Sequence, residues 1–423
     1  MLDLKFIREN VEQIRQGLAA KNSRVDLDAI LVLDEERRAL IVKVDQLKSR
    51  KNAANDEISL LIREKKDPAQ AIAAMKSVAA EIDVIDPRLA VIEDEITQKL
   101  LYVPNMPQSQ VPLGGPENNR EVRRCGDFYS FDFKPQDHVA LAERLDIIDF
   151  KRATKLSGAN FLLYKKAGAL LERALINFML DLHTRHHGYE EVFPPVLVNA
   201  ASMQGTGQLP KMKDDMYCLP EDALYLIPTA EVPVTNMYRD EILDESRLPL
   251  YHTAYSSCFR REAGSYGKDT RGLMRVHQFN KVELVKFVKP ETSYAELEML
   301  VSNAERVFQL LKLPYRVIEL AAGDMSFAAA KCYDLEVYAP GLDKWLEASS
   351  CSNFEEFQAR RANIRYKGAG MKKPVFVHTL NGSGVATPRT MIAIIENYQQ
   401  ADGSILVPEA LWPYTNGLKK ITV

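Results

Sequence analysis

The feature that most constrains this chain is a heptad pattern in its first hundred residues. From Leu33 onward, apolar residues recur at spacings of three and four, and a cleaner run follows it. The first run comprises Leu33, Leu40, Val44, Leu47, Ala54, Ile58 and Leu61, with Arg37 and Lys51 interrupting the same register; the second comprises Ala71, Met75, Val78, Ile82, Ile85, Leu89, Ile92 and Ile96. A period near 3.5 residues is typical of a coiled coil. Because Asp67-Pro68 would break a continuous helix, the pattern predicts two helices of roughly 30–35 residues, folded back as an antiparallel arm roughly 50 Å long.

Positive charge concentrates in the distal half of this arm. Positions 48–66 hold six cations against three acids. The cations are Lys48, Arg50, Lys51, Arg63, Lys65 and Lys66. A charge run of this kind is usually a solvated face, and it is also the form that a polyanion-binding surface takes.

Composition excludes several classes of protein. The chain has 423 residues, of which 46% are hydrophobic and 27% charged, and its formal net charge is −3. This is globular composition without a global basic field, so a polyanion would have to bind a local patch. The five cysteines form no CxxC or CxxH pair, which favours a reducing compartment and predicts no structural zinc. No apolar run is long enough to span a bilayer and the start resembles no targeting peptide, so we expect a cytoplasmic protein without a membrane partner.

The rest of the chain has a mixed pattern. A Pro/Gly-rich stretch at 104–120 reads as an extended linker between an N-terminal domain, 1–103, and a second domain, 121–423. Strand-like runs and helical runs then follow without regular alternation. The predicted fold class is therefore α+β, with an antiparallel sheet flanked by helices. The expected helices are 161–182, 294–311 and 390–399; the expected strands are 191–198, 255–261, 276–288, 315–320, 335–338 and 375–380.

Three clusters of polar residues could carry chemistry. The run from Cys258 to Arg275 contains four arginines and a lysine between apolar strands, which suits phosphate binding or a salt-bridged hairpin. The run from Gly382 to Arg389 joins a strand to a helix and marks a tight turn or a nucleotide site. Carboxylates among apolar neighbours, at Glu231, Glu283 and Glu347, could hold an ammonium group or Mg²⁺, or form structural ion pairs.

The histidines and cysteines indicate a functional site less clearly than these three clusters. His183, His186 and His187 lie near a helix end without a metal-binding spacing, and we expect them at the surface. The lone cysteines are expected in the core, and no Ser/His/Asp or Cys/His arrangement stands out. Gly264–Thr270 is too short for a P-loop and has Asp269 where Ser or Thr is required.

Taken together, these segments resemble the class II aminoacyl-tRNA synthetases, and specifically the seryl-tRNA synthetases of bacterial type. The resemblance covers essentially the whole chain. Gly188–Pro195 is similar to the first class II motif, Phe259-Arg260-Arg261-Glu262 with Arg275–Phe279 to the second, and Gly382–Arg389 to the third. Gly205–Pro210, Thr229–Glu231 and the N-terminal helical hairpin add to the match. Thr387-Pro388 before the last arginine departs from the general class pattern and looks like the seryl family's own form.

The resemblance implies an activity: ATP and L-serine form seryl-adenylate and pyrophosphate, and serine is then transferred to the terminal adenosine of tRNA(Ser). Charging of tRNA(Sec) is a further expectation from the family. It also implies a homodimer in which the arm grips tRNA bound for the other subunit. The distal cations named above would contact that RNA.

The resemblance also implies roles for site residues. Arg260 would hold the ATP α-phosphate and Glu262 the adenine amino group, and Arg389 would stack on the adenine opposite Phe279. Glu347 and Ser350 would hold Mg²⁺ on the phosphates, and Arg271 would meet the γ-phosphate. The other implied ATP-binding positions are Arg261, Val276, Ala348 and Ser349. Glu283 would pair with the serine ammonium, and the implied enclosure of the serine side chain comprises Thr229, Ala230, Glu231 and Ser383.

Three other functions fit parts of the chain. A coiled-coil scaffold with a non-catalytic head predicts no ATP binding. A synthetase paralogue that loads a carrier protein would lack the long arm. A coiled-coil P-loop ATPase is disfavoured because no Walker motif is present.

Overall fold

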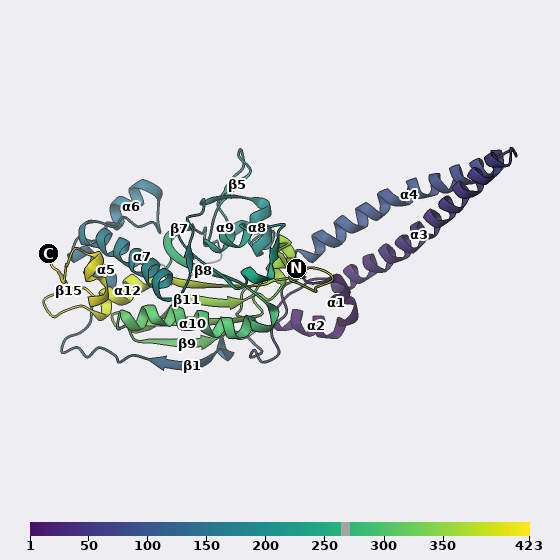
Figure 1. Ribbon diagram of the computed structural model, residues 1–423. Coiled ribbons are helices and arrows are strands. Elements are labelled where there is room, and N and C mark those ends of the chain that lie inside the picture. Colours follow the sequence, from purple (N-terminus) through teal and green to yellow (C-terminus); the bar gives the residue numbers. More distant parts are fainter. Residues whose placement is uncertain (264–270) are drawn as a thin grey trace. The chain divides into compact units, whose positions relative to one another are not determined.

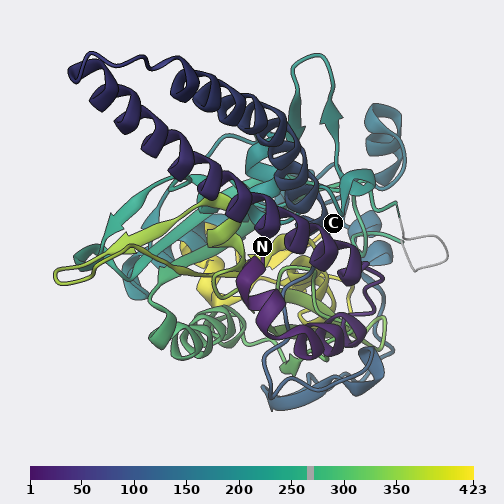
Figure 2. The same cartoon turned by 90° about the vertical axis from the view of Figure 1, so that its right-hand side faces the viewer.

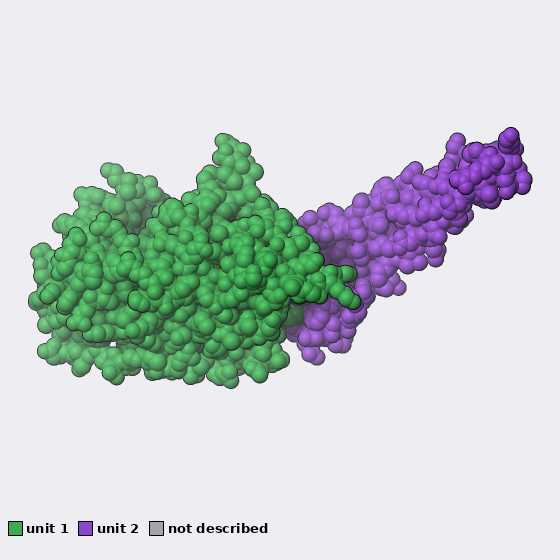
Figure 3. Space-filling view, viewed as in Figure 1, with its two compact units in different colours: residues 1, 105–423 green, residues 2–104 purple. Residues whose placement is uncertain are grey.

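The computed structural model describes residues 1–263 and 271–423. The middle of the predicted basic loop, 264–270, therefore lies outside the described residues. The chain divides into two compact units, one of residues 2–104 and the other of residue 1 with 105–423 (Figure 3). The domain limits at 103 and 120 that we drew from the sequence stay a prediction.

The N-terminal unit contains the predicted helical arm. Two short helices, α1 (Leu4–Glu9) and α2 (Val11–Ala20), precede two long ones, α3 (Leu27–Arg63) and α4 (Ala69–Leu100). The long helices run side by side, as Figures 1 and 2 show from two directions. The turn between them contains Asp67-Pro68, as predicted. The coiled-coil arm is thereby confirmed.

Burial along the arm follows the heptad positions. In α4, Val78, Ile82, Ile85, Ile92 and Ile96 are buried, whereas Val84 and Val91 on the other face are exposed. In α3 the seam is less regular, since Val44 and Leu47 are buried and the other predicted positions are half-buried. This seam supplies most of the stability that helices of this length need in water.

Ion pairs between α3 and α4 flank the buried seam. Arg37, which interrupts the heptad pattern, reaches across to Glu93, with Nε 3.1 Å from Oε1. Arg88 pairs with Glu36 in the same way, at 2.8 Å. Pro87 lies inside α4, a position that sequence reasoning did not single out and that removes one intrahelical hydrogen bond.

The second unit is built on an eight-stranded sheet, in the order β1-β9-β10-β11-β14-β8-β7-β2. Its strands are β1 (Arg120–Cys125), β2 (Glu190–Glu191), β7 (Leu250–Phe259), β8 (Gln278–Val288), β9 (Tyr315–Glu319), β10 (Lys331–Ala339), β11 (Lys344–Asn353) and β14 (His378–Ala386). Every neighbouring pair is antiparallel except β2 and β7, which are parallel. The predicted α+β class is confirmed.

Smaller elements surround this sheet. The short strands are β3 (Leu197–Asn199), β4 (Cys218–Leu219), β5 (Leu224–Leu226), β6 (Ile242–Asp244), β12 (Arg365–Lys367), β13 (Val375–Phe376), β15 (Ile405–Leu406) and β16 (Lys420–Ile421). The helices are α5 (His138–Arg144), α6 (Phe150–Ser157), α7 (Lys166–His186), α8 (Ala200–Thr206), α9 (Glu231–Asn236), α10 (Ser293–Leu310), α11 (Phe357–Ala362) and α12 (Thr387–Asn397).

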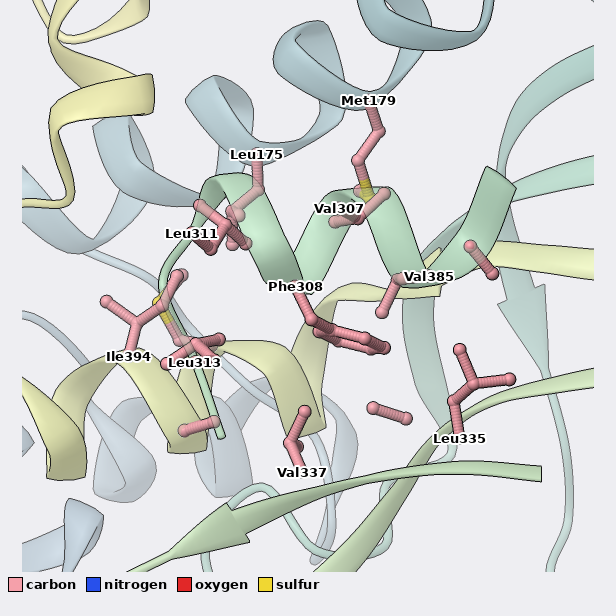
Figure 4. Packing of buried hydrophobic residues seen from close by; sticks show 14 of the residues in the cluster. Leu175, Met179, Val307, Phe308, Leu311, Leu313, Leu335, Val337, Val385 and Ile394 are labelled. Atoms are coloured by element: carbon pink, nitrogen blue, oxygen red, sulfur yellow. The ribbon is translucent and has the colours of Figure 1, made fainter. Parts of the chain in front are cut away.

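Three of these helices share the main hydrophobic core with the sheet. Phe308 of α10 is fully buried, and Figure 4 shows it between Val337 and Leu335 of β10 and Val385 of β14. The same helix meets α7 through Leu175 and Met179 and α12 through Ile394. This layer of helices covers one face of the sheet.

Several element boundaries differ from the sequence prediction. The first long helix of this unit, α7, begins at Lys166 and not at Phe161. The expected strand 191–198 is broken into β2 and β3 because Pro194-Pro195 cannot donate to a ladder. Strand β11, which carries Glu347–Ser350, has no clear strand signal in the sequence because three serines and a cysteine occupy its second half.

The Pro/Gly-rich segment is hydrogen-bonded to residues 322–330. The Asn105 amide nitrogen donates to Phe327 O at 3.0 Å, and that of Gln108 to Ala330 O at 2.9 Å. Asn105 itself is buried and its side chain donates to Ala328 O and Phe354 O. Among the described residues, no helix combines the length and apolarity that crossing a membrane requires.

Candidate active site

Strand β8 separates the hydrophobic core from a polar cavity. Val282 and Leu284 face the helices and join the main core. Phe279, Lys281 and Glu283 alternate with them and therefore point to the opposite face. On that face lies a cavity of about 560 Å³, lined by residues of α8, α9, β8, β11, β14 and the start of α12, and by Arg260 directly after β7.

One end of the cavity is acidic. Thr229 Oγ1 donates to Glu283 Oε2 at 2.6 Å, and Lys281 forms an ion pair with the same oxygen. Asn381 Nδ2 donates to Glu231 Oε2 at 2.8 Å and to Glu283 Oε1 at 3.3 Å. Two buried carboxylates are thus held side by side by one amide, and Lys281 pairs with Glu283.

The charge state of Glu231 reflects this crowding. Burial, followed by the neighbouring Glu283 carboxylate, raises the pKa of Glu231 to about 7. Gln358 Nε2 opposes this shift by donating to Glu231 Oε1 at 2.6 Å, and Thr379 Oγ1 fixes Gln358 at 2.8 Å. A cation entering the cavity would favour the ionised form of Glu231.

The next part of the wall combines arginine with an aromatic ring. The Arg260 guanidinium carbon lies 5.1 Å from the centre of the Phe279 ring, and its Nε donates to Pro228 O at 3.3 Å. Arg275 Nη1 forms an ion pair with Glu262 Oε2 at 2.8 Å. A cation and a flat apolar surface beside each other suit a phosphate linked to a planar base.

Strand β11 supplies the third part of the wall. Arg389, near the start of α12, donates to Glu347 O at 2.6 Å and pairs with Glu347 Oε2 at 3.2 Å. Ser350 Oγ lies 3.2 Å from Cys332 Sγ. Behind them, burial and then the neighbouring Glu347 carboxylate raise the pKa of Asp334 well above its ordinary value.

The structure brings most of the predicted site residues to this one cavity. Those that line it are Thr229, Glu231, Arg260, Glu262, Val276, Phe279, Glu347, Ala348, Ser349, Ser350, Ser383 and Arg389. Glu283 lies directly behind Thr229, and Ala230 is buried beneath it. Arg261 is exposed, and Arg271 forms an ion pair with Asp137 at 3.2 Å, so neither lines the cavity.

Sequence reasoning missed three polar residues of the acidic end. Lys281, Asn381 and Gln358 fix the two carboxylates, yet none stands in a recognisable motif. Lys281 and Asn381 could have been found from strand alternation, because each lies two residues from a predicted site residue, Glu283 and Ser383. Gln358 lies on α11 and has no such signal.

The structure corrects the expectation for histidine. His183 is completely buried, and its Nε2 lies 3.5 Å from Gly384 O. Burial lowers the pKa of His183 to about 3, so the ring is neutral. It packs against the glycine-rich turn because Gly384 has no Cβ to keep it away.

Cysteine chemistry and a metal cluster find no support in the described residues. Burial raises the pKa of Cys258, Cys332 and Cys351, so these thiols are not nucleophiles. The expectation that the cysteines lie in the core is wrong for the other two, since Cys125 is half-buried and Cys218 is exposed. In residues 1–263 and 271–423, no three His, Cys, Asp or Glu side chains are grouped to hold a metal ion.

Comparison with known proteins identifies the family of this chain. The seryl-tRNA synthetase N-terminal domain family matches residues 1–107, and the class II tRNA synthetase core domain (G, H, P, S and T) matches residues 217–398. The serine–tRNA ligase of Carboxydothermus hydrogenoformans is 56% identical over 98% of both chains, and that of Trichlorobacter lovleyi 55% over all of both. The crystal structure of seryl-tRNA synthetase from Pyrococcus horikoshii complexed with ATP superposes with a TM-score of 0.94 at 37% identity, covering 100% of this chain and 99% of that one. This chain therefore belongs to the seryl-tRNA synthetases, within class II of the aminoacyl-tRNA synthetases.

Proposed function

We propose that the cavity joins L-serine to ATP and that the arm selects the tRNA that receives the serine. The chain is a serine–tRNA ligase: serine and ATP give seryl-adenylate and pyrophosphate, and the seryl group then passes to the terminal adenosine of tRNA. The observation that carries this assignment is the arrangement of the cavity, in which an acidic end that suits an ammonium group adjoins an arginine–aromatic wall that suits a nucleotide. Transfer to tRNA(Sec) stays a prediction.

Serine would occupy the acidic end. Its ammonium group meets the negative charge of Glu231 and Glu283, which a single lysine does not balance. Thr229 and Ser383 enclose its short side chain, and Ala230 supports them from below. A site that hydrogen-bonds a hydroxyl rejects alanine strongly because its own polar groups are then left unpaired, whereas threonine has to be excluded by size.

ATP would lie along the arginine–aromatic wall. The adenine stacks between Phe279 and Arg389, and Glu262 accepts a hydrogen bond from its amino group. Arg260 is placed to neutralise the α-phosphate. Phe279, Arg389, Glu262 and Arg260 all line the cavity, which supports the proposal. Arg271 could meet the γ-phosphate only by leaving Asp137.

The residues at β11 fit the Mg²⁺ that accompanies ATP. Glu347 and Ser350 present oxygen ligands, which Mg²⁺ prefers. Asp334 lies opposite Ser350 in the pairing of β10 with β11 and places a third oxygen-bearing side chain beside them. When bound, Mg²⁺ would neutralise charge on the phosphate oxygens.

The first reaction step needs no general base. The carboxylate of serine is already ionised at neutral pH, and one of its oxygens attacks the α-phosphorus while the bond to pyrophosphate breaks. The protein contributes position and charge neutralisation, above all through Arg260. In agreement with this mechanism, the described residues that line the cavity include no histidine or cysteine.

The arm would provide the contact with tRNA. In the distal half of the arm, Lys48, Arg50, Arg63 and Lys65 are exposed, whereas Lys66 pairs with Glu64 and Lys51 is half-buried. Exposed cations on a stiff hairpin suit the RNA backbone, which is recognised by shape and charge. A homodimer and a cytoplasmic location complete the proposal, and both rest on the family.

A pyrophosphate-exchange assay tests the assignment. With ATP, Mg²⁺ and each of the twenty amino acids in turn, we expect exchange to depend on serine. Exchange that responds more strongly to threonine or alanine would contradict the proposed specificity. No exchange with any amino acid would contradict the proposed reaction.

A further inference from the structure

A buried histidine and a buried glutamate lie outside the three motifs and beside the cavity wall. His138, the first residue of α5, is 1% exposed, and Glu396, in the last turn of α12, is completely buried. His138 Nδ1 lies 2.9 Å from Glu396 Oε1. Burying ionisable groups costs free energy unless they are fully hydrogen-bonded, so we expect this buried pair to have a structural or functional role.

The hydrogen bonds around Glu396 determine where the proton of His138 lies. Glu396 Oε1 accepts from the His138 amide at 2.9 Å, and Oε2 accepts from the amides of Gly341 at 2.8 Å and Leu342 at 3.1 Å. With donors on both oxygens, the carboxylate acts only as an acceptor. His138 Nδ1 therefore carries a hydrogen, and in the neutral ring Nε2 is left as an acceptor.

That free acceptor faces the backbone of the second motif. The Leu273 amide donates to His138 Nε2 at 3.3 Å. Gly272 precedes it with φ of +67°, and a Cβ there would come within 2.3 Å of the same nitrogen, so only glycine fits. Arg271 adds a second tether through Asp137. The backbone at residues 271–273 is thus held against the start of α5.

The fixed point lies next to the nucleotide wall. Met274, Arg275 and Val276 follow Leu273 directly, and all three line the cavity. Arg275 in turn holds Glu262, on the other side of the loop, by the ion pair described above. A shift at Leu273 would therefore move the part of the wall that meets ATP and leave the acidic end in place.

We propose that His138, oriented by Glu396, is a positioning residue for ATP: its Nε2 accepts the Leu273 amide and so sets the position of Met274–Val276. The inference rests on the proposed function, because it assumes that this wall binds ATP. Since Glu396 lies on the helix that begins with the third motif, the pair links the second and third motifs through α5.

Two substitutions in the full chain separate this role from simple packing. His138→Asn keeps a donor for Glu396 and loses the acceptor for Leu273. His138→Gln keeps an acceptor near the position of Nε2 and loses the donor. In serine-dependent pyrophosphate exchange, we expect the Asn variant to raise the KM for ATP about tenfold, as for one lost buried hydrogen bond, with the KM for serine unchanged within about twofold. We expect the Gln variant to stay within about threefold of the wild type for both.

Controls make the outcomes distinct. His378→Asn serves as the matched control, because His378 bonds Ser293 Oγ at 2.9 Å and does not line the cavity; its KM for ATP should not change. Equal effects of Asn and Gln, or a parallel rise in both KM values, would overturn the inference. If one variant does not fold, the other still decides, since each has its own predicted KM for ATP. A wild type without serine-dependent exchange would instead refute the proposed function.

Discussion

Glu231 and Glu283 share one amide: Asn381 Nδ2 donates to both carboxylates, at 2.8 and 3.3 Å. The two acids come from different elements, the start of α9 and the middle of β8. Both are buried and Lys281 pairs with Glu283, so an added ammonium group would improve the electrostatic balance of the site. This relationship makes serine binding depend on pH.

Serine should bind more tightly as pH rises from 6 to 8. Glu231 has a pKa of about 7, so it is mostly protonated at pH 6 and mostly ionised at pH 8, and only the ionised form attracts the ammonium group. The ionised fraction changes roughly tenfold across this range, and the KM for serine should fall by a similar factor. Exchange assays at saturating ATP measure it. A KM for serine that is flat between pH 6 and 8, or that rises, would contradict this account of Glu231.

Glu231 also makes stability depend on pH. Its pKa is about 7 in the folded chain and near 4.5 when unfolded, so the folded state binds the extra proton between these values and the free energy of unfolding falls as pH rises through them. The loss amounts to roughly 3 kcal/mol. Glu231→Gln cannot titrate and should gain stability relative to the wild type between pH 5 and 8, in thermal unfolding without ligands. A constant difference between the two proteins would show that Glu231 is not perturbed.

Removing positive charge from the distal half of the arm should weaken tRNA binding and leave serine activation unchanged. Replacing Lys48, Arg50 and Lys65 by alanine removes three exposed cations. We expect a higher KM for tRNA and a shallower salt dependence, by about two to three in the slope of log affinity against log salt, with pyrophosphate exchange unchanged. Lys372→Ala with Lys373→Ala removes exposed cations of the other unit as a control. Equal charging of tRNA by the wild type and this triple variant at all salt concentrations would rule out this contact.

Two neighbouring positions on α4 test the helical seam. Ile85 is 7% exposed and Val84 is 76% exposed, although they are adjacent in sequence. Ile85→Ala should destabilise the arm by about 2–4 kcal/mol because it removes a buried side chain, whereas Val84→Ala should change stability by less than about 0.5 kcal/mol. Hydrogen exchange of α3 and α4 in increasing urea measures the difference. Similar exchange in both variants would mean that the seam runs along another face.

Local periodicity explains why the arm could be predicted so fully. Which face of each long helix is buried depends on spacing within the helix, and spacing is visible in the sequence. The turn at Asp67-Pro68 is equally local. Pro87 falls inside the helix that the heptad run of residues 71–96 predicts, and the packing of α4 against α3 tolerates a proline that propensity alone disfavours.

Site residues that stand in sequence motifs could be predicted, whereas residues placed by the pairing of distant strands could not. Arg260, Glu262 and Arg389 stand in recognisable motifs, and all line one cavity. The role of Asn381 depends instead on how β14 pairs with β8, a relation between segments about a hundred residues apart. His183 was placed at the surface for the same reason, since its burial depends on Gly384, 201 residues away.

The most direct test is a crystal structure of the full chain with a non-hydrolysable mimic of seryl-adenylate. We predict that its adenine lies between Phe279 and Arg389, with the phosphate-like group beside Arg260 and the ammonium group between Glu231 and Glu283. A mimic that binds elsewhere, or with its amino acid and base exchanged between the two ends, would contradict the central claim that this one cavity joins serine to ATP.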